Sequence, residues 1–148
     1  MNILARILRP SRVAHAHCDG PCGVYDPASA RIAAEAVLSM EKKLAALPDD
    51  QSLATANTRT RFIGIKEEQA EIVKCELDIL WHDYFKPEHL EKYANLHDVF
   101  WKATKLASKN KTESDPANGE ALLAAIEEIH NMYWGSKGRT DVPFYRAG

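Results

Sequence analysis

The chain has 148 residues, of which 45% are hydrophobic and 27% charged, and its formal net charge is −2. These values are typical of one soluble globular domain and exclude a disordered chain. Three cysteines are too few for a disulfide scaffold, and no apolar run approaches the roughly 20 residues that span a bilayer, so we expect no membrane partner. Because the chain is net acidic and has no dense basic stripe, we expect no nucleic-acid partner either.

The first 16 residues differ in charge from the rest of the chain. They contain three arginines and no acidic residue, whereas the remaining residues carry a formal charge of −5. This contrast is typical of a targeting or processing segment, but the apolar stretch of roughly 7–15 residues in a secretory signal is missing. An organelle transit peptide and a frayed N-terminus stay open as alternatives. We interpret residues 1–16 as a removable leader, because cleavage after residue 16 would free an amine that the motif after it can use as a metal ligand.

The hydrophobic periodicity predicts four helices and no strand. The first helix opens at Asp26-Pro27, since Asp caps free N–H groups and Pro suits the first helical position. It ends before Pro48, and residues 48–58 are expected to form a polar turn. The second helix is expected over residues 60–85. Its apolar stripe comprises Phe62, Ile65, Ile72, Val73, Leu77, Ile79 and Leu80.

The second half of the chain predicts two more helices. The third is expected over residues 87–108, and the fourth starts at Asp115-Pro116 and ends before Gly135. Four amphipathic helices joined by short loops predict an all-α fold, an antiparallel up-down four-helix bundle over residues 28–135. The tail of residues 136–148 has no readable period. Cys75 is expected to be buried, and the histidines at 82, 89 and 97 to be solvated.

The segment before the first helix carries the informative motif. Residues 17–27 read His-Cys-Asp-Gly-Pro-Cys-Gly-Val-Tyr-Asp-Pro, and we call them the hook. Cys18 and Cys22 do not have the Cys-x-x-Cys spacing of a thioredoxin-like site, and the segment offers too few ligands for a complete zinc site. The plain alternative is a local disulfide between these cysteines, or two idle thiols.

Cleavage between Ala16 and His17 would create a metal chelator. The new α-amine, the Cys18 amide nitrogen and the Cys18 thiolate can bind one metal, and the turn at Gly20-Pro21 can return the Cys22 thiolate to the fourth position. A square-planar site with two nitrogens and two sulfurs favours Ni(II) or Cu(II). The His17 imidazole can reach an axial position. The uncut chain has no free amine at His17. The metal site therefore requires cleavage, and this requirement accounts for the presence of a leader.

On these residues the chain resembles the nickel superoxide dismutases, whose mature chains begin His-Cys-Asp-x-Pro-Cys-Gly-x-Tyr-Asp-Pro. The resemblance continues in residues 65–71, 80–87 and 91–93, and covers roughly residues 17–134. It implies that the chain converts superoxide to dioxygen and hydrogen peroxide by cycling between Ni(II) and Ni(III), with one nickel ion per chain. It further implies a homohexamer and a cytoplasmic location, which agrees with reduced thiols. A leader-processing peptidase is the remaining expected partner.

The resemblance also implies roles for individual residues. The metal ligands are His17, through its amine and imidazole, Cys18, through its amide nitrogen and thiolate, and Cys22. Tyr25 resembles the tyrosine that guards the open face of the metal, and it is the expected catalytic residue. Four residues are expected around the metal or at its entrance, with Tyr84 behind Tyr25 and Lys86 adding positive potential. These four are Asp19, Tyr84, Gln69 and Lys86.

The chain departs from the family at the support of the axial imidazole. The family commonly uses a glutamate on the first helix and an arginine on the second, and the matching positions here are Ala33 and Gln69. Removing one partner of a buried ion pair costs ~3–5 kcal/mol, so losing both avoids an orphaned charge. We expect the Gln69 carbonyl to accept from the imidazole N–H; a glutamine bonded to backbone at the edge of the core is the alternative. Gly20 replaces a usually bulky residue, which is expected to loosen the hook.

Two other functions stay open. A non-enzymatic metal-binding or structural helical bundle on the same scaffold would keep the ligands and lose the redox tuning. A binding module with a Cys18–Cys22 disulfide would hold no metal and would tolerate an N-terminal extension.

Overall fold

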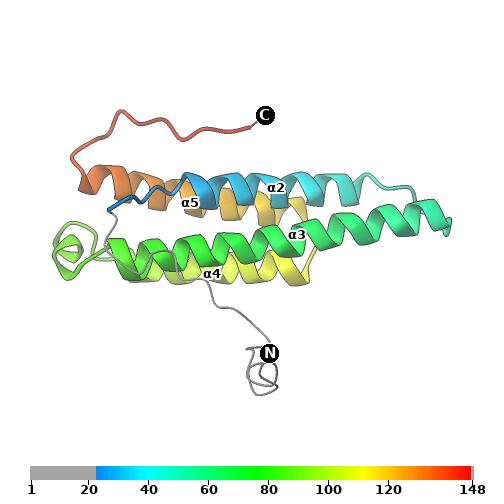
Figure 1. Cartoon of the computed structure of the whole chain (residues 1–148), viewed down its shortest axis with the longest axis horizontal. Helices are drawn as coiled ribbons and strands as arrows, with labels where there is room; N and C mark the ends of the chain where they lie inside the picture. Colours follow the sequence, from blue (N-terminus) through cyan, green and yellow to red (C-terminus); the bar gives the residue numbers. More distant parts are fainter. Residues whose placement is uncertain (1–22, 148) are drawn as a thin grey trace, which may run out of the picture.

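Four long antiparallel helices form an up-down bundle in the computed structural model, which describes residues 23–147 (Figure 1). They are α2 (Ala28–Ala45), α3 (Leu53–Ile79), α4 (Leu96–Thr112) and α5 (Pro116–Ser136). The described part of the chain contains no strand, so the all-α bundle that the periodicity predicts is confirmed. None of its helices is long and apolar enough to cross a membrane.

Side-chain caps decide where two of the helices begin. The Asp115 carboxylate accepts from the Ala117 N–H at 2.9 Å, and Pro116 occupies the first turn, as the sequence predicts. The Ser52 hydroxyl accepts from the Thr55 N–H at 3.1 Å and starts α3. The expected polar turn over residues 48–58 is therefore wrong beyond Ser52, because a cap starts a helix even where the sequence lacks an apolar period.

The connection between α3 and α4 is irregular rather than helical throughout. The last turn of α3 widens into the π-helical η1 (Leu80–Tyr84), and the 3-10 helix η2 (Pro87–Glu91) follows. Lys86 is extended, with φ −125° and ψ 163°, because the following proline excludes the helical region. The expected continuous helix over residues 87–108 is wrong, since α4 begins only at Leu96 and runs to Thr112.

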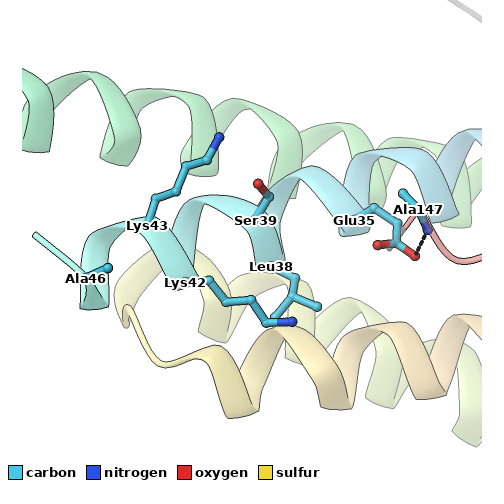
Figure 2. A pocket seen from close by; sticks show the side chains of 7 residues that line it. All are labelled: Glu35, Leu38, Ser39, Lys42, Lys43, Ala46 and Ala147. Carbon is cyan, nitrogen blue, oxygen red and sulfur yellow. Dashed lines mark hydrogen bonds between the residues drawn. The ribbon is translucent and has the colours of Figure 1, made fainter.

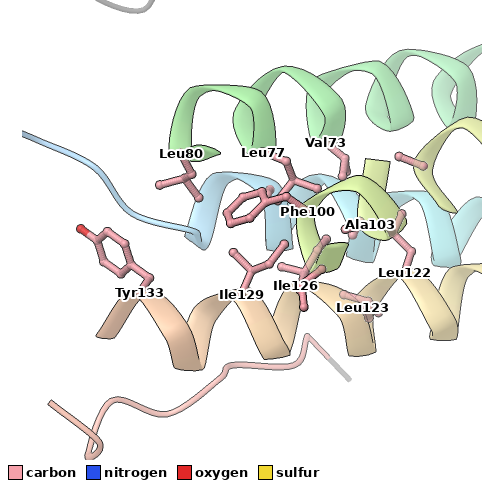
Figure 3. Close-up of a cluster of buried hydrophobic side chains, with 14 of the residues drawn as sticks. Val73, Leu77, Leu80, Phe100, Ala103, Leu122, Leu123, Ile126, Ile129 and Tyr133 are labelled. Carbon is pink, nitrogen blue, oxygen red and sulfur yellow. The ribbon is translucent and has the colours of Figure 1, made fainter. Parts of the chain in front are cut away.

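The core is a row of buried apolar side chains that runs along the bundle axis (Figure 3). Leu77, Phe100, Ile126, Ile129 and Tyr133 are all fully buried there, and Tyr133 lies at the end nearest the chain segment that enters α2. Each buried aliphatic or aromatic side chain stabilises the fold by roughly 1.5–3 kcal/mol relative to an exposed one.

The expected apolar stripe of α3 is only partly buried. Val73 and Leu77 face the core, but Ile65 and Ile72 are 40% and 37% exposed. Lys66 and Ala70 take the buried positions instead. Cys75 is exposed, contrary to expectation. The helix is thus rotated so that part of its apolar stripe faces away from its own bundle.

A buried polar cluster closes the end of the bundle where α4 passes into α5. The Lys66 ammonium donates to the backbone carbonyls of Asn110, Lys111 and Glu113, and so satisfies the C-terminal end of α4. The Glu41 carboxyl is fully buried beside it, and neither of its oxygens has a hydrogen-bond partner. Burial raises the pKa of Glu41 to about 7, and the Lys66 charge opposes part of that rise.

The tail after α5 folds back along the bundle (Figure 1). The His130 ring lies 3.0 Å from the Val142 carbonyl oxygen, and the Phe144 ring packs edge-on against His130. Near the end of the tail, Arg146 pairs with Glu120 at 2.7 Å and with Glu35 at 3.6 Å. These contacts bind the tail across α2 and α5.

Candidate functional site

The expected metal ligands His17, Cys18 and Cys22 lie outside the residues that the structure describes, and so does Asp19. The described chain begins at Gly23, directly after the last expected ligand. Gly23 has φ 69°, a left-handed conformation that favours glycine. This left-handed residue lies in the sequence between the last expected ligand and the segment that leads into α2.

Three of the expected site residues line one cavity of about 370 Å³. Tyr25 comes from the segment before α2, Tyr84 from η1, and Lys86 from the extended link before η2. The remaining lining residues are Gly23, Asp83, Glu88 and His89. Because Gly23 is part of the wall, the cavity adjoins the end of the hook. Gln69 does not line it; this side chain is half-buried on α3.

The two tyrosines are in contact. The ring centroids of Tyr25 and Tyr84 are 5.7 Å apart at an interplanar angle of 56°. The Tyr84 hydroxyl lies 2.6 Å from Ser136 Oγ, and Ser136 in turn donates to the Tyr133 carbonyl at 2.6 Å. A serine hydroxyl has one proton, so Tyr84 is the donor in its bond to Ser136. The end of α5 thus fixes the tyrosine that lies behind Tyr25.

A second cation, Lys137, lies beside these aromatic rings. Its Nζ is 5.4 Å from the Tyr84 ring centroid and 4.8 Å from that of Tyr133. A hydrogen bond with Tyr133 raises the pKa of Lys137, and the nearby Asp26 adds to the rise. Lys137 therefore keeps its charge at neutral pH. Together with the exposed Lys86 it places two positive charges around the tyrosines.

Sequence reasoning missed the contribution of α5. Tyr133, Ser136 and Lys137 lie at positions i, i+3 and i+4, a spacing that places them on one face of a helix end. This spacing was the available signal. It could not indicate the site alone, because only the fold brings the end of α5 to residues that lie about 110 positions earlier.

His89 is also part of the site, although it was expected to be solvated. Its Nδ1 accepts from the Lys86 N–H at 2.9 Å, and its ring stacks on Tyr84 with centroids 5.7 Å apart. Because Nδ1 is an acceptor, the neutral ring carries its proton on Nε2. His97 is not free either, since its Nδ1 accepts from the Trp81 indole at 2.8 Å.

The donor set of the hook suits nickel. Two thiolates combined with nitrogen donors are ligands that bind Ni(II) well, and Gly23, the residue that follows Cys22 in the sequence, lines the tyrosine cavity. Among residues 23–147, no group of three or more His, Cys, Asp or Glu side chains is placed to hold a metal ion.

Another cavity, of about 380 Å³, lies along α2 beside the end of the tail (Figure 2). Its lining includes Lys42, Lys43 and Ala147 and no aromatic side chain. Lys42 is paired with Glu120 at 3.1 Å. This cavity shares no lining residue with the one that holds the tyrosines.

Comparison with known proteins identifies the family. The family model described as "Nickel-containing superoxide dismutase" matches residues 12–137. The nickel superoxide dismutase of Streptomyces seoulensis is 44% identical over 135 residues, covering 91% of this chain and 98% of that protein. That of Streptomyces coelicolor is 42% identical over 135 residues, with the same coverage.

Solved structures agree with the sequence matches. A native nickel superoxide dismutase structure superposes with a TM-score of 0.75 at 44% identity, covering 83% of this chain and 100% of that one. A structure with nickel ligation corresponding to the oxidised state gives a TM-score of 0.76 at 46% identity and the same coverage. On its hook sequence, its fold and these matches, the chain belongs to the nickel-containing superoxide dismutases.

Proposed function

We propose that this chain is a superoxide dismutase that converts two superoxide ions and two protons to dioxygen and hydrogen peroxide at the hook. One observation carries the proposal: the hook sequence leads through Gly23 directly into a cavity where Tyr25 and Tyr84 are in contact. The relatives and solved structures that match this chain bear the same activity in their names.

Maturation is part of the proposal. A peptidase removes residues 1–16, and the freed His17 amine binds one nickel ion together with the Cys18 amide nitrogen and the thiolates of Cys18 and Cys22. The His17 imidazole would be a further ligand of the bound nickel. Bound nickel supplies one-electron chemistry by cycling between Ni(II) and Ni(III). Residues 28–135 carry the hook as a bundle, and residues 136–148 form the tail.

The described residues have distinct tasks in this proposal. Tyr25 restricts access to the open face of the hook, and Tyr84 holds it from behind. Lys86 and Lys137 attract the superoxide anion, because like-signed cations around a cavity raise the local concentration of an anionic substrate. Asp19 stays a proposed neighbour of the metal, since it lies between two ligands in the hook.

Gln69 is proposed to support the axial imidazole by accepting from its distal N–H. The motive is its half-buried place on α3 at the position matching the family arginine. Groups that orient a metal-bound histidine tune the metal. Gln69→Ala should therefore shift the Ni(III) EPR spectrum and lower the turnover of superoxide. Unchanged activity together with an unchanged spectrum would refute this role.

The assembly and location are proposed with the activity. The exposed Ile65 and Ile72 on α3 offer an apolar face to another subunit, which supports a homohexamer. Thiolate ligands need reduced cysteines, which supports the cytoplasm.

The first test is a native mass spectrum of protein purified from nickel-fed cells that can process it, followed by an assay of superoxide turnover. We expect a hexamer of chains that start at His17, each with one nickel ion, and rapid turnover. A processed chain with nickel but no turnover would favour the non-enzymatic metal-binding bundle. A processed chain without nickel would favour a Cys18–Cys22 disulfide, which mass measurement under reducing and non-reducing conditions detects.

A further inference from the structure

The last turn of α5 contacts the backbone at the base of the hook. The Tyr133 hydroxyl donates to the backbone carbonyl of Tyr25. Ser136, one turn further, accepts from the hydroxyl of Tyr84, whose ring contacts the ring of Tyr25. We propose that Tyr133 is a positioning residue that holds the hook in register with the tyrosine cavity by fixing the Tyr25 carbonyl. This inference rests on the proposed function.

Tyr133 is well placed to hold another group without moving itself. Its side chain is fully buried at the end of the core (Figure 3). Its ring centroid lies 4.6 Å from that of Tyr84 and 5.0 Å from that of Trp134. The Lys137 ammonium covers its ring at 4.8 Å. A side chain that is packed on several sides and cannot change rotamer freely transmits its position to its hydrogen-bond partner.

A hydrogen bond to the Tyr25 carbonyl constrains the backbone close to the expected ligands. Tyr25 lies three residues after Cys22, and the left-handed Gly23 lies between them. On the other side, the Asp26 carboxylate accepts from the Ala28 N–H at 2.8 Å and ties the segment to α2. The Tyr133 bond thus fixes the backbone of the hook between its expected ligands and the start of α2, while Tyr84 contacts the Tyr25 ring.

The hydroxyl of Tyr133 is separable from its ring. A phenylalanine would fill the same space and keep the ring contact with Tyr84, so the hydroxyl is not needed for packing. A buried hydroxyl without a partner would cost free energy, which the bond to Tyr25 avoids. The substitution Tyr133→Phe therefore keeps the ring and removes the two hydrogen bonds of the hydroxyl, the one to the Tyr25 carbonyl and the one with Lys137.

The experiment compares the processed, nickel-loaded protein with its Tyr133→Phe variant. Losing one hydrogen bond changes an equilibrium or rate by about two- to tenfold. We expect nickel to transfer to a chelator such as EDTA about two- to tenfold faster, and the Ni(III) EPR hyperfine pattern to change. The midpoint of thermal unfolding of the metal-free chain should fall by no more than a few degrees, as the loss of one hydrogen bond does. Tyr145→Phe is the matched control, since Tyr145 is 70% exposed in the tail and should leave all three unchanged.

The outcomes separate this inference from the proposed function. Nickel-loaded, active protein in which Tyr133→Phe leaves the release rate and the EPR spectrum unchanged would overturn the positioning role and leave the enzyme intact. An unsubstituted, processed chain that binds no nickel would overturn both. Hydrogen exchange of the amides of residues 24–26 in the metal-free chain adds a readout without metal. It should accelerate in Tyr133→Phe, and equal exchange in the two proteins would also count against the inference.

Discussion

At the scale of one residue, a substitution of Lys86 tests whether positive charge at the cavity attracts superoxide. Its side chain is exposed at the wall of the tyrosine cavity, so its charge acts on an approaching anion through solvent. Lys86→Gln should lower kcat/KM for superoxide by about two- to fivefold and weaken the dependence of the rate on ionic strength. Stopped-flow or pulse-radiolysis kinetics at two salt concentrations measure both effects.

Lys105→Gln is the control for this substitution. Lys105 is an exposed lysine on α4 whose ammonium lies 5.7 Å from the Trp101 ring centroid, and it does not line the cavity. The two variants have the same net charge. Equal rates and equal salt dependence in both would show that the position of Lys86 does not matter.

Glu41 makes stability depend on pH. In the folded chain its pKa is about 7, above its ordinary value of 4.5, because burial disfavours the charged carboxylate. Between these values the folded state holds a proton that the unfolded chain has released. The contribution of Glu41 to the free energy of unfolding is therefore fully present below about pH 4.5. It is lost as the pH rises through about 7, and the total loss is about 1–3 kcal/mol.

Glu41→Gln should remove that dependence, since the amide does not titrate. At pH 8 the variant should be more stable than the parent by about 1–3 kcal/mol, and at pH 5.5 the difference should shrink. Urea unfolding of both proteins at the two pH values gives the free energies of unfolding. A difference that does not vary with pH would mean that Glu41 is already ionised in the folded protein.

At the scale of elements, the contact between α2 and α5 depends on Gly119. A Cβ atom at this position would lie 2.5 Å from Glu41 Oε2 and 3.1 Å from Leu38 Cα. The backbone of Leu38 cannot move aside without shifting α2. Gly119→Ala should therefore lower the free energy of unfolding by about 1–3 kcal/mol, as overpacking does.

Gly64→Ala is the matched control on α3. A Cβ there meets nothing within 4 Å. Alanine forms helix better than glycine, so this variant should gain about 0.5–1 kcal/mol. Denaturant unfolding of both variants thus has opposite expected signs. A Gly119→Ala protein that is as stable as the parent would contradict the close approach of the two helices.

The sequence predicts a helix best where a local capping motif marks its start. Asp115-Pro116 marks the start of α5, and the cap is present as predicted. The start of α3 at Leu53 was missed because its first two turns are mostly exposed and have no apolar period that marks them. Periodicity also identified Ile65 and Ile72 as part of an apolar face but could not tell which partner covers that face.

For the whole molecule, the hook motif could be read directly because its expected ligands, His17, Cys18 and Cys22, lie close together in the sequence. The cavity beside it could be read only in part. Tyr25 and Tyr84 were expected through the family resemblance and Lys86 through its charge, and the structure brings these three together. Tyr133 and Lys137 were not, because their place in the site depends on the antiparallel return of α5 to the start of α2.

The last prediction concerns assembly. The exposed Ile65 and Ile72 lie seven residues apart on one face of α3, with the half-buried Gln69 between them in sequence. If this face is buried between subunits, an ammonium placed on it would lose its hydration without gaining a partner. Ile65→Lys should therefore convert the proposed hexamer to smaller species, with helical content unchanged.

Native mass spectrometry and circular dichroism measure the two properties. Ala124→Lys is the control, because it adds the same charge on the exposed face of α5 and should leave the assembly intact. Since Gln69 occupies the same face, loss of the assembly should also alter the surroundings of the proposed imidazole partner. Dissociated Ile65→Lys protein should then show the same change in the Ni(III) EPR spectrum as Gln69→Ala. A hexamer that persists in Ile65→Lys would place the subunit interface on another face of the bundle.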